Sequence, residues 1–127
     1  MILVDTSVLV DYFRAPSDHT LKILEANQAA ICGVIRAEIL AGTRSPGEIS
    51  RISTCLNALQ QIPLPENIWD RVGYYLALLR SAGITVPFTD AVIATVAVDN
   101  KIPLWTRDVH FQRMQSVILE LELFPEP

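Results

Sequence analysis

Long hydrophobic runs, basic leader residues and a high density of charge are all missing from this sequence. No apolar stretch approaches the ~20 residues that a bilayer-spanning helix needs. The first residues carry no basic segment and reach an acid at Asp5, so we expect no signal peptide and a cytoplasmic protein. Half of the residues are hydrophobic and only 19% are charged, which excludes a disordered chain.

Cysteine and histidine are also scarce. Cys32 and Cys55 lie far apart and have no second Cys or His at metal-ligand spacing, so we predict neither a disulfide framework nor a zinc site. Cys32 is expected in the core and Cys55 on a helix face. Neither His19 nor His110 is well placed in the sequence for acid–base catalysis, and we expect His110 to be a surface or packing residue.

Positive charge is in short supply, since 10 basic residues face 14 acidic ones and the net charge is -4. This balance argues against a protein that binds nucleic acid through a positive field alone. It does not exclude a nuclease, because carboxylates that hold divalent cations reverse the local sign of charge. Most of the basic residues are arginines, whose planar guanidinium suits phosphate.

What the sequence does contain is an alternation of strand-like and helical patterns over a length typical of one domain. Strands are predicted at residues 2–5, 30–35, 61–64, 102–106 and 119–123, and the apolar run 84–88 is strand-like too. Helical patterns lie between them, including a new helix that starts at Ser17. The alternation predicts a three-layer α/β/α domain with a mainly parallel sheet of about five strands.

Two of the expected helices stand out. The helix at residues 65–82 has an apolar stripe, and its aromatic residues Trp69 and Tyr75 are candidates for a subunit contact in a homodimer. The helix that follows Asp90 is apolar on every side, as expected of a helix buried against the sheet.

Four acidic residues each come just after a strand-like run: Asp5, Glu38, Asp90 and Asp108. The strand ends of an open parallel sheet meet at one edge, where ligands bind. Clustered carboxylates repel one another, and they stay ionised together when they hold Mg²⁺ or Mn²⁺ through oxygen ligands. The pattern therefore predicts metal-dependent phosphate chemistry.

Each acid also has a purely structural explanation. Asp5 and Asp108 could cap helices, Asp90 could occupy a first helical turn, and Glu38 could be an exposed helix residue. The joint pattern is harder to explain in this way, because Glu38 is flanked by Ala37 and apolar residues and Asp90 opens the most hydrophobic helix. Acids in such places approach the core and need a partner.

The same positions carry a family resemblance. The segments VDTS at 4–7, RAEI at 36–39, FTDAVIA at 88–94 and WTRD at 105–108 resemble the acidic signatures of PIN-domain ribonucleases, and specifically of the VapC-type toxins of type II toxin–antitoxin pairs. The resemblance covers nearly the whole chain in order and spacing. It implies a single PIN-like nuclease domain over residues 1–127.

The resemblance further implies that the four acids form the catalytic site and together bind Mg²⁺ or Mn²⁺, with one or two ions. The expected activity is an endoribonuclease that hydrolyses phosphodiester bonds with a metal-activated water. A cognate antitoxin protein is the implied partner, and RNA is the implied substrate.

Other residues near this sheet edge are candidates for supporting roles. Hydroxyls can orient ligating carboxylates, or they can simply cap helices, and the candidates are Thr6, Ser7 and Thr106. Arginines can contact RNA phosphates, or they can form salt bridges to nearby acids, and the candidates are Arg14, Arg36, Arg44 and Arg107.

Two alternatives from other classes remain open at this level. A phospho-accepting receiver-like domain has a similar length and an acidic metal pocket, but it needs adjacent acids near the first strands and a lysine at a late strand end. Here Lys101 precedes the fourth strand instead. A non-catalytic RNA-binding or interaction module would use its acids only to cap helices.

Overall fold

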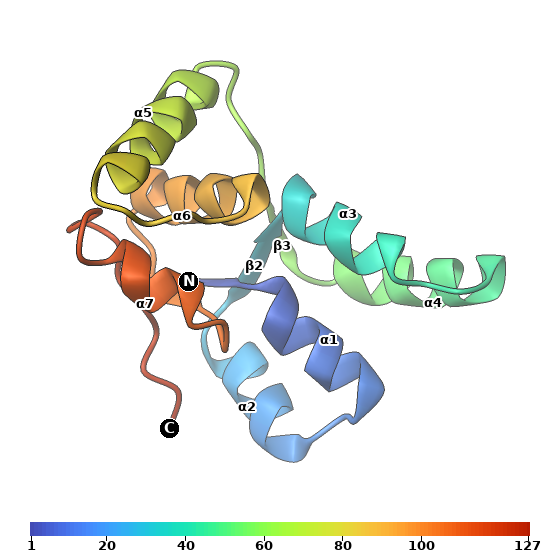
Figure 1. The fold of residues 1–127 in the computed structure, drawn as a ribbon. Coiled ribbons are helices and arrows are strands. Elements are labelled where there is room, and N and C mark those ends of the chain that lie inside the picture. The colour runs from blue at the N-terminus through green and yellow to red at the C-terminus, as the bar shows by residue number, and fades with distance from the viewer.

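A computed structural model describes all 127 residues and shows a four-stranded parallel sheet surrounded by helices (Figure 1). The strands are β1 (Ile2–Val4), β2 (Ala29–Cys32), β3 (Gln60–Ile62) and β4 (Leu104–Trp105). Their order across the sheet is β3-β2-β1-β4, and every neighbouring pair is parallel. The expected α/β fold with a parallel sheet is confirmed.

Seven helices connect and cover these strands. They are α1 (Thr6–Arg14), α2 (Asp18–Ala26), α3 (Gly33–Ala41), α4 (Pro46–Asn57), α5 (Ile68–Ser81), α6 (Phe88–Asn100) and α7 (His110–Met114). In Figure 1, α5 and α6 lie on one side of the sheet and α1 and α2 on the other. No helix is both long enough and apolar enough to cross a membrane.

The core lies around the two central strands and α6. Every residue of β1 and β2 is buried, and so is the run 90–97 of α6. This helix contacts α3, α5 and α7, which explains why its sequence is apolar all round.

Side-chain caps fix where several helices begin. The carboxylate of Asp5 accepts a hydrogen bond from the backbone N–H of Ser7 at the start of α1, and Ser17 caps α2 in the same way. Ser45 precedes Pro46, the first residue of α4, and accepts from the N–H of Glu48. The predicted helix start at Ser17 is confirmed.

The strand-like runs before Glu38 and Asp90 were misread from the sequence. The expected strand at residues 30–35 ends at Cys32, and α3 begins at Gly33 because Ile35 packs into the core from a helix. Residues 84–88 form no strand at all. After α5 the backbone turns at Gly83, which has a φ of +78°, and the N–H of Ile84 bonds back to the carbonyl of Leu79 at 2.8 Å.

The remaining strands are also shorter than expected. The third and fourth strands, predicted at 61–64 and 102–106, are limited to Gln60–Ile62 and Leu104–Trp105. The predicted edge strand at 119–123 is reduced to a single bridge between Leu104 and Leu123. Alternation suggested a strand, but Leu119 is 79% exposed, so the segment buries only part of its apolar side.

Candidate metal centre

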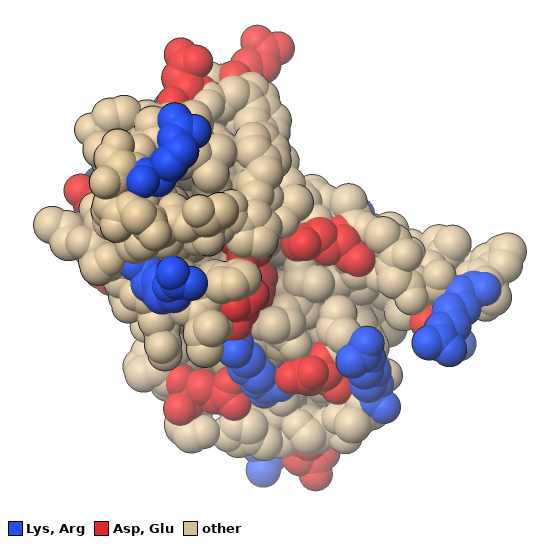
Figure 2. All heavy atoms as spheres, viewed as in Figure 1, with Lys and Arg blue, Asp and Glu red and all other residues tan.

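The sheet order places a crevice between the ends of β1 and β4. From β1 the chain moves outward to β2 and β3 and then returns to add β4 on the other side of β1. Open parallel sheets bind ligands at such a reversal, beyond the carboxyl ends of the strands. Asp5 directly follows β1, and Asp108 follows β4. Figure 2 shows acidic side chains in the hollow at the middle of this face.

Asp5 is 4% exposed and firmly oriented. Its Oδ2 accepts hydrogen bonds from Ser7 Oγ at 2.7 Å and from Thr106 Oγ1 at 2.8 Å. Thr106 Oγ1 in turn accepts from the backbone N–H of Asp108 at 3.0 Å. One threonine hydroxyl therefore joins the acid after β1 to the acid after β4.

Glu38 lies on α3 and reaches the same region through a hydroxyl. Thr6 Oγ1 donates to Glu38 Oε1 at 2.9 Å, and Thr6 is the residue after Asp5. Glu38 does not belong to the most closely packed group of potential ligands, which is formed by other residues.

That closest group consists of Asp90, Asp108 and His110. His110 Nδ1 lies 3.2 Å from Asp90 Oδ2 and 3.4 Å from Asp108 Oδ1, and one ligand atom from each residue lies within 4.8 Å of the others. The backbone N–H of His110 also donates to Asp108 Oδ1 at 3.0 Å. The expectation that His110 is a surface or packing residue was wrong, because its imidazole faces two of the four acids.

The charges at this site are poorly compensated. No lysine or arginine forms an ion pair with Asp5, Glu38, Asp90 or Asp108, and His110 is the one ionisable partner of opposite sign. Burial raises the pKa of the Asp90 carboxyl above its ordinary 3.8, the contact with His110 lowers it, and the charges of Asp108 and Asp5 raise it again. The net effect is a raised pKa, so the ionised form of Asp90 is disfavoured relative to an exposed aspartate.

The donor atoms suit a hard divalent ion. In each of the four acids one carboxylate oxygen is held by a neighbouring group, and the other makes no hydrogen bond within the protein. No fully buried side-chain polar atom lacks a partner, so each of these four free oxygens keeps at least a small solvent-exposed area. Carboxylate oxygens are the kind of ligand that Mg²⁺ and Mn²⁺ prefer.

Two of the four candidate arginines bond to neighbouring side chains. The guanidinium of Arg107 bonds to Asp11 Oδ2 at 2.9 Å and to Glu126 Oε1 at 3.1 Å, and it lies over the ring of Trp105. Arg36 Nη2 donates to Asn57 Oδ1 at 2.6 Å. Arg44 contributes its backbone N–H to Glu48 Oε2.

Arg14 has a different setting. It lines a groove of about 400 Å³ between α1, α3 and α4, together with Glu38, Thr43 and Arg51. Sequence reasoning missed Arg51, which lies in an ordinary helical pattern on α4 and carries no signal of its own. The groove begins at one of the four acids, and it contains two arginines whose side chains make no ion pair.

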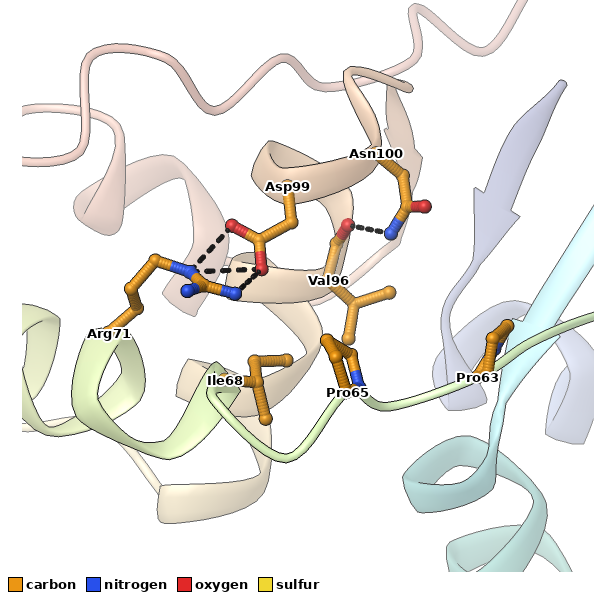
Figure 3. Close-up of a pocket in the computed structure, with 7 residues that line it drawn as sticks. All are labelled: Pro63, Pro65, Ile68, Arg71, Val96, Asp99 and Asn100. Atoms are coloured by element: carbon orange, nitrogen blue, oxygen red, sulfur yellow. Dashed lines mark hydrogen bonds and ion pairs between the residues drawn. The ribbon is translucent and has the colours of Figure 1, made fainter.

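A second hollow lies at the far end of α6, away from the acids. It measures about 520 Å³ and is lined by Pro63, Pro65, Ile68, Arg71, Val96, Asp99 and Asn100 (Figure 3). Its two charged residues point toward one another, and Arg71 Nε bonds to Asp99 Oδ1 at 3.0 Å. These two charges pair with each other, so the hollow presents no unpaired charged side chain.

Comparison with known proteins shows which family and which fold the chain resembles. Residues 2–117 match the family model of the PIN domain. The chain is 30% identical over 119 residues to VapC ribonuclease Mb1587 of Mycobacterium bovis, covering 87% of this chain and 89% of that protein. It is 26% identical to ribonuclease VapC1 of Methanocaldococcus jannaschii, covering 94% and 85%. The fold matches that of Rickettsia felis VapBC2, solved with a promoter DNA fragment, with a TM-score of 0.82, 22% identity and 98% of each chain covered.

Proposed function

Since the chain belongs to the PIN-domain family and to its VapC group, we propose that it is a metal-dependent endoribonuclease and the toxin of a toxin–antitoxin pair. The observation that carries this proposal is the close group formed by Asp90, Asp108 and His110. Thr106 links Asp5 to Asp108 and Thr6 holds Glu38, and no lysine or arginine forms an ion pair with any of the four acids. Asp5, Glu38, Asp90 and Asp108 are the proposed catalytic and metal-binding residues.

A bound Mg²⁺ or Mn²⁺ would supply Lewis-acid chemistry for phosphodiester hydrolysis. The protein's own residues provide the rest. Ser7 and Thr106 hold Oδ2 of Asp5, and Thr6 holds Oε1 of Glu38, so that the second oxygen of each acid keeps a fixed direction. The near-complete burial of Asp5 and Asp90 limits the water around the ligands and strengthens their electrostatic interactions.

The groove between α1, α3 and α4 is the proposed path of the RNA strand. It starts at Glu38, and Arg14 and Arg51 are placed along it to meet phosphates. Arg36 and Arg44 remain weaker candidates for phosphate contacts, because Arg36 bonds to Asn57 and Arg44 contributes only its backbone here. Arg107 is better described as a structural residue, since Asp11 and Glu126 both hold it.

The receiver-like alternative is not supported by the site. That chemistry needs a lysine beside the acids, but Lys101 caps the C-terminal end of α6, whereas Asp90 lies in the first turn of the same helix. A purely structural role for the acids does not explain all of their contacts either. Asp5 does cap α1, but capping does not explain why Asp90 and Asp108 share one imidazole nitrogen.

Two partners complete the proposal. One similar structure is a toxin–antitoxin complex from Klebsiella pneumoniae, and another is a member of the VapBC family of toxin–antitoxin systems from Mycobacterium tuberculosis. We infer that this chain has a cognate antitoxin too. A homodimer is proposed because α5 and the start of α6 expose aromatic side chains: Trp69 at 49%, Tyr74 at 61% and Phe88 at 58%, with Trp69 and Phe88 stacked. Tyr75 is partly buried and so contributes less to such a contact. Analytical ultracentrifugation at micromolar concentration should give twice the monomer mass, and a purely monomeric species would contradict the dimer.

The function is tested by incubating purified protein with end-labelled total RNA. Cleavage at defined sites is expected with Mg²⁺ or Mn²⁺, and none with excess chelator. Sequencing the new ends identifies the target RNA. Cleavage that persists unchanged in chelator, or the absence of any cleavage with either ion, would contradict the proposal.

A further inference from the structure

We propose that His110 is a nitrogen ligand of the metal centre and that it gives the site a preference for Mn²⁺ over Mg²⁺. The inference rests on the proposed function, but it concerns a residue outside the four acids that the resemblance identifies. It commits the site to a mixed nitrogen–oxygen ligand set.

The distances from the His110 ring to two carboxylates fit a shared metal ion. His110 Nδ1 lies 3.2 Å from Asp90 Oδ2 and 3.4 Å from Asp108 Oδ1. An octahedral ion with bonds of about 2.1 Å has adjacent ligand atoms about 3.0 Å apart, from the geometry of a right-angled pair. His110 Nδ1 therefore lies near the spacing of an adjacent ligand from both carboxylate oxygens, and the three ligand atoms all lie within 4.8 Å of one another.

A backbone hydrogen bond holds His110 beside Asp108. The N–H of His110 donates to Asp108 Oδ1 at 3.0 Å, which fixes the start of α7 against the acid that follows β4. The only partners of the imidazole are these two acids, because no hydrogen bond reaches its Nε2. The side chain is 36% exposed, so the ring can be reached from solvent.

An imidazole nitrogen changes which ions the site favours. Mg²⁺ strongly favours oxygen ligands and retains its waters, whereas first-row transition ions accept imidazole nitrogen readily. A single nitrogen among carboxylate oxygens therefore shifts selectivity away from Mg²⁺. The same contacts could instead be hydrogen bonds from the ring to the two carboxylates, in which case the ring would not bind the ion.

The experiment uses the fact that the chain has only two histidines. The matched control is His19→Gln, because His19 also lies beside a carboxylate, Glu126, but forms no ion pair with any of the four acids. Wild type, His19→Gln and His110→Gln are each loaded with Mn²⁺ and measured by pulsed electron paramagnetic resonance for ¹⁴N coupling to the ion. Isothermal titration with Mn²⁺ and with Mg²⁺ then gives the ratio of the two dissociation constants.

The expected result is ¹⁴N coupling in wild type and in His19→Gln and its loss in His110→Gln. The preference for Mn²⁺ over Mg²⁺ should fall about tenfold in His110→Gln, because the glutamine offers only an oxygen, and should not change in His19→Gln. Mn²⁺ bound to wild type without ¹⁴N coupling would overturn the role of His110 and leave the proposed nuclease intact. Failure of wild type to bind either ion at millimolar concentration would overturn both.

His19→Gln keeps the test decisive even if His110→Gln folds poorly. In His19→Gln, His110 is the only remaining histidine. A coupled nitrogen then identifies His110, and an uncoupled Mn²⁺ excludes it.

Discussion

Asp5 has two roles, since the same carboxylate caps α1 and faces the crevice between β1 and β4. Asp5→Asn keeps a side-chain oxygen that can accept from Ser7 and Thr106, so we expect the fold to survive. The charge is lost, and RNA cleavage should fall by more than about 100-fold, because removing one group that stabilises charge at a reaction centre typically costs 10²–10³ in rate. Cleavage rates and circular dichroism measure the two effects separately.

Asp11→Asn is the matched control for this change. Asp11 also lies on α1, but its side chain is 54% exposed and pairs with Arg107 rather than with the acidic cluster. Its cleavage rate should stay within about threefold of wild type, because surface ion pairs contribute little. Equal losses in the two variants would mean that Asp5 acts only through helix stability.

Arg14 allows a test of the RNA path. If Arg14 in the groove meets one phosphate, Arg14→Gln should weaken RNA binding and reduce the slope of log K against log salt by about 0.7, the value for one contact to a single strand. Binding is measured by fluorescence anisotropy in chelator at several salt concentrations. Arg80→Gln, on α5 and outside the groove, should leave the slope unchanged. A slope that is the same in both variants would exclude Arg14 from the path.

Single residues were predictable from the sequence where they stand next to a strand or open a helix. Asp5 and Asp108 are recognised by the strands before them, and the sheet order explains why those two strand ends meet. His110 was not recognised, because its role depends on α6 bringing Asp90 to the same point from 20 residues away. A lone histidine gives no periodic signal that could reveal such a contact.

Among the larger elements, the C-terminal segment is tied to the crevice by Glu126. Its carboxylate accepts from Trp105 Nε1 at 2.6 Å and from Arg107 Nε at 3.1 Å, and His19 lies 3.4 Å away. Burial alone would raise the pKa of Glu126, but the bonds from Arg107, Trp105 and His19 outweigh it and lower the pKa. These contacts hold the last residues against β4 and α2.

Glu126→Gln should lower the free energy of unfolding by about 1 kcal/mol at neutral pH, since hydrogen bonds to a charged, partly exposed group are lost. The pKa of Glu126 is lowered in the folded state, so its contribution is present above the ordinary value of 4.5 and is lost as the pH falls through the lowered pKa. The stability difference from wild type should therefore shrink in acid, as measured by urea unfolding at several pH values.

Glu122→Gln provides the comparison, because the Glu122 side chain is exposed and makes no hydrogen bond. It should change stability little at any pH. A difference between Glu126→Gln and wild type that persists undiminished at the lowest pH would show that the ionised carboxylate is not what holds the segment.

Elements were predicted well where local signals and burial agree. Ser17 caps a helix, and the uniformly apolar α6 is buried. Prediction failed where apolar β-branched residues sit on helices or in connections. Ile35 faces the core from α3, and residues 84–87 form a connection in which the N–H of Ile84 bonds to the carbonyl of Leu79 on α5. Burial alone makes a sequence apolar, so a short apolar run does not distinguish a strand from either alternative.

For the molecule as a whole, the fold gathers negative charge at the crevice between β1 and β4. The raised pKa of Asp90 means that its ionised form costs native-state stability in the absence of an ion: its contribution is present below 3.8 and is lost as the pH rises through the raised pKa. At neutral pH the metal-free protein should therefore gain stability from Mn²⁺. Saturation to about 100 times the dissociation constant adds about 2.7 kcal/mol, a rise of several degrees in Tm by calorimetry.

Asp90→Asn separates the stability cost of the ionised Asp90 from the stability gained when Mn²⁺ binds. In chelator the variant should melt above the metal-free wild type, because a poorly compensated charge is gone, and Mn²⁺ should raise its Tm much less. A full Mn²⁺ shift in Asp90→Asn would place the stabilising ion at another site.

The central claim is that the acids at positions 5, 38, 90 and 108 converge on one divalent ion. The most direct measurement is a crystal structure of Mn²⁺-loaded protein, with the ion located by its anomalous scattering. We predict a peak about 2.0–2.3 Å from carboxylate oxygens of Asp5, Asp90 and Asp108, with Glu38 bound directly or through water. An anomalous peak away from this crevice, in crystals of protein that cleaves RNA with Mn²⁺, would contradict the account.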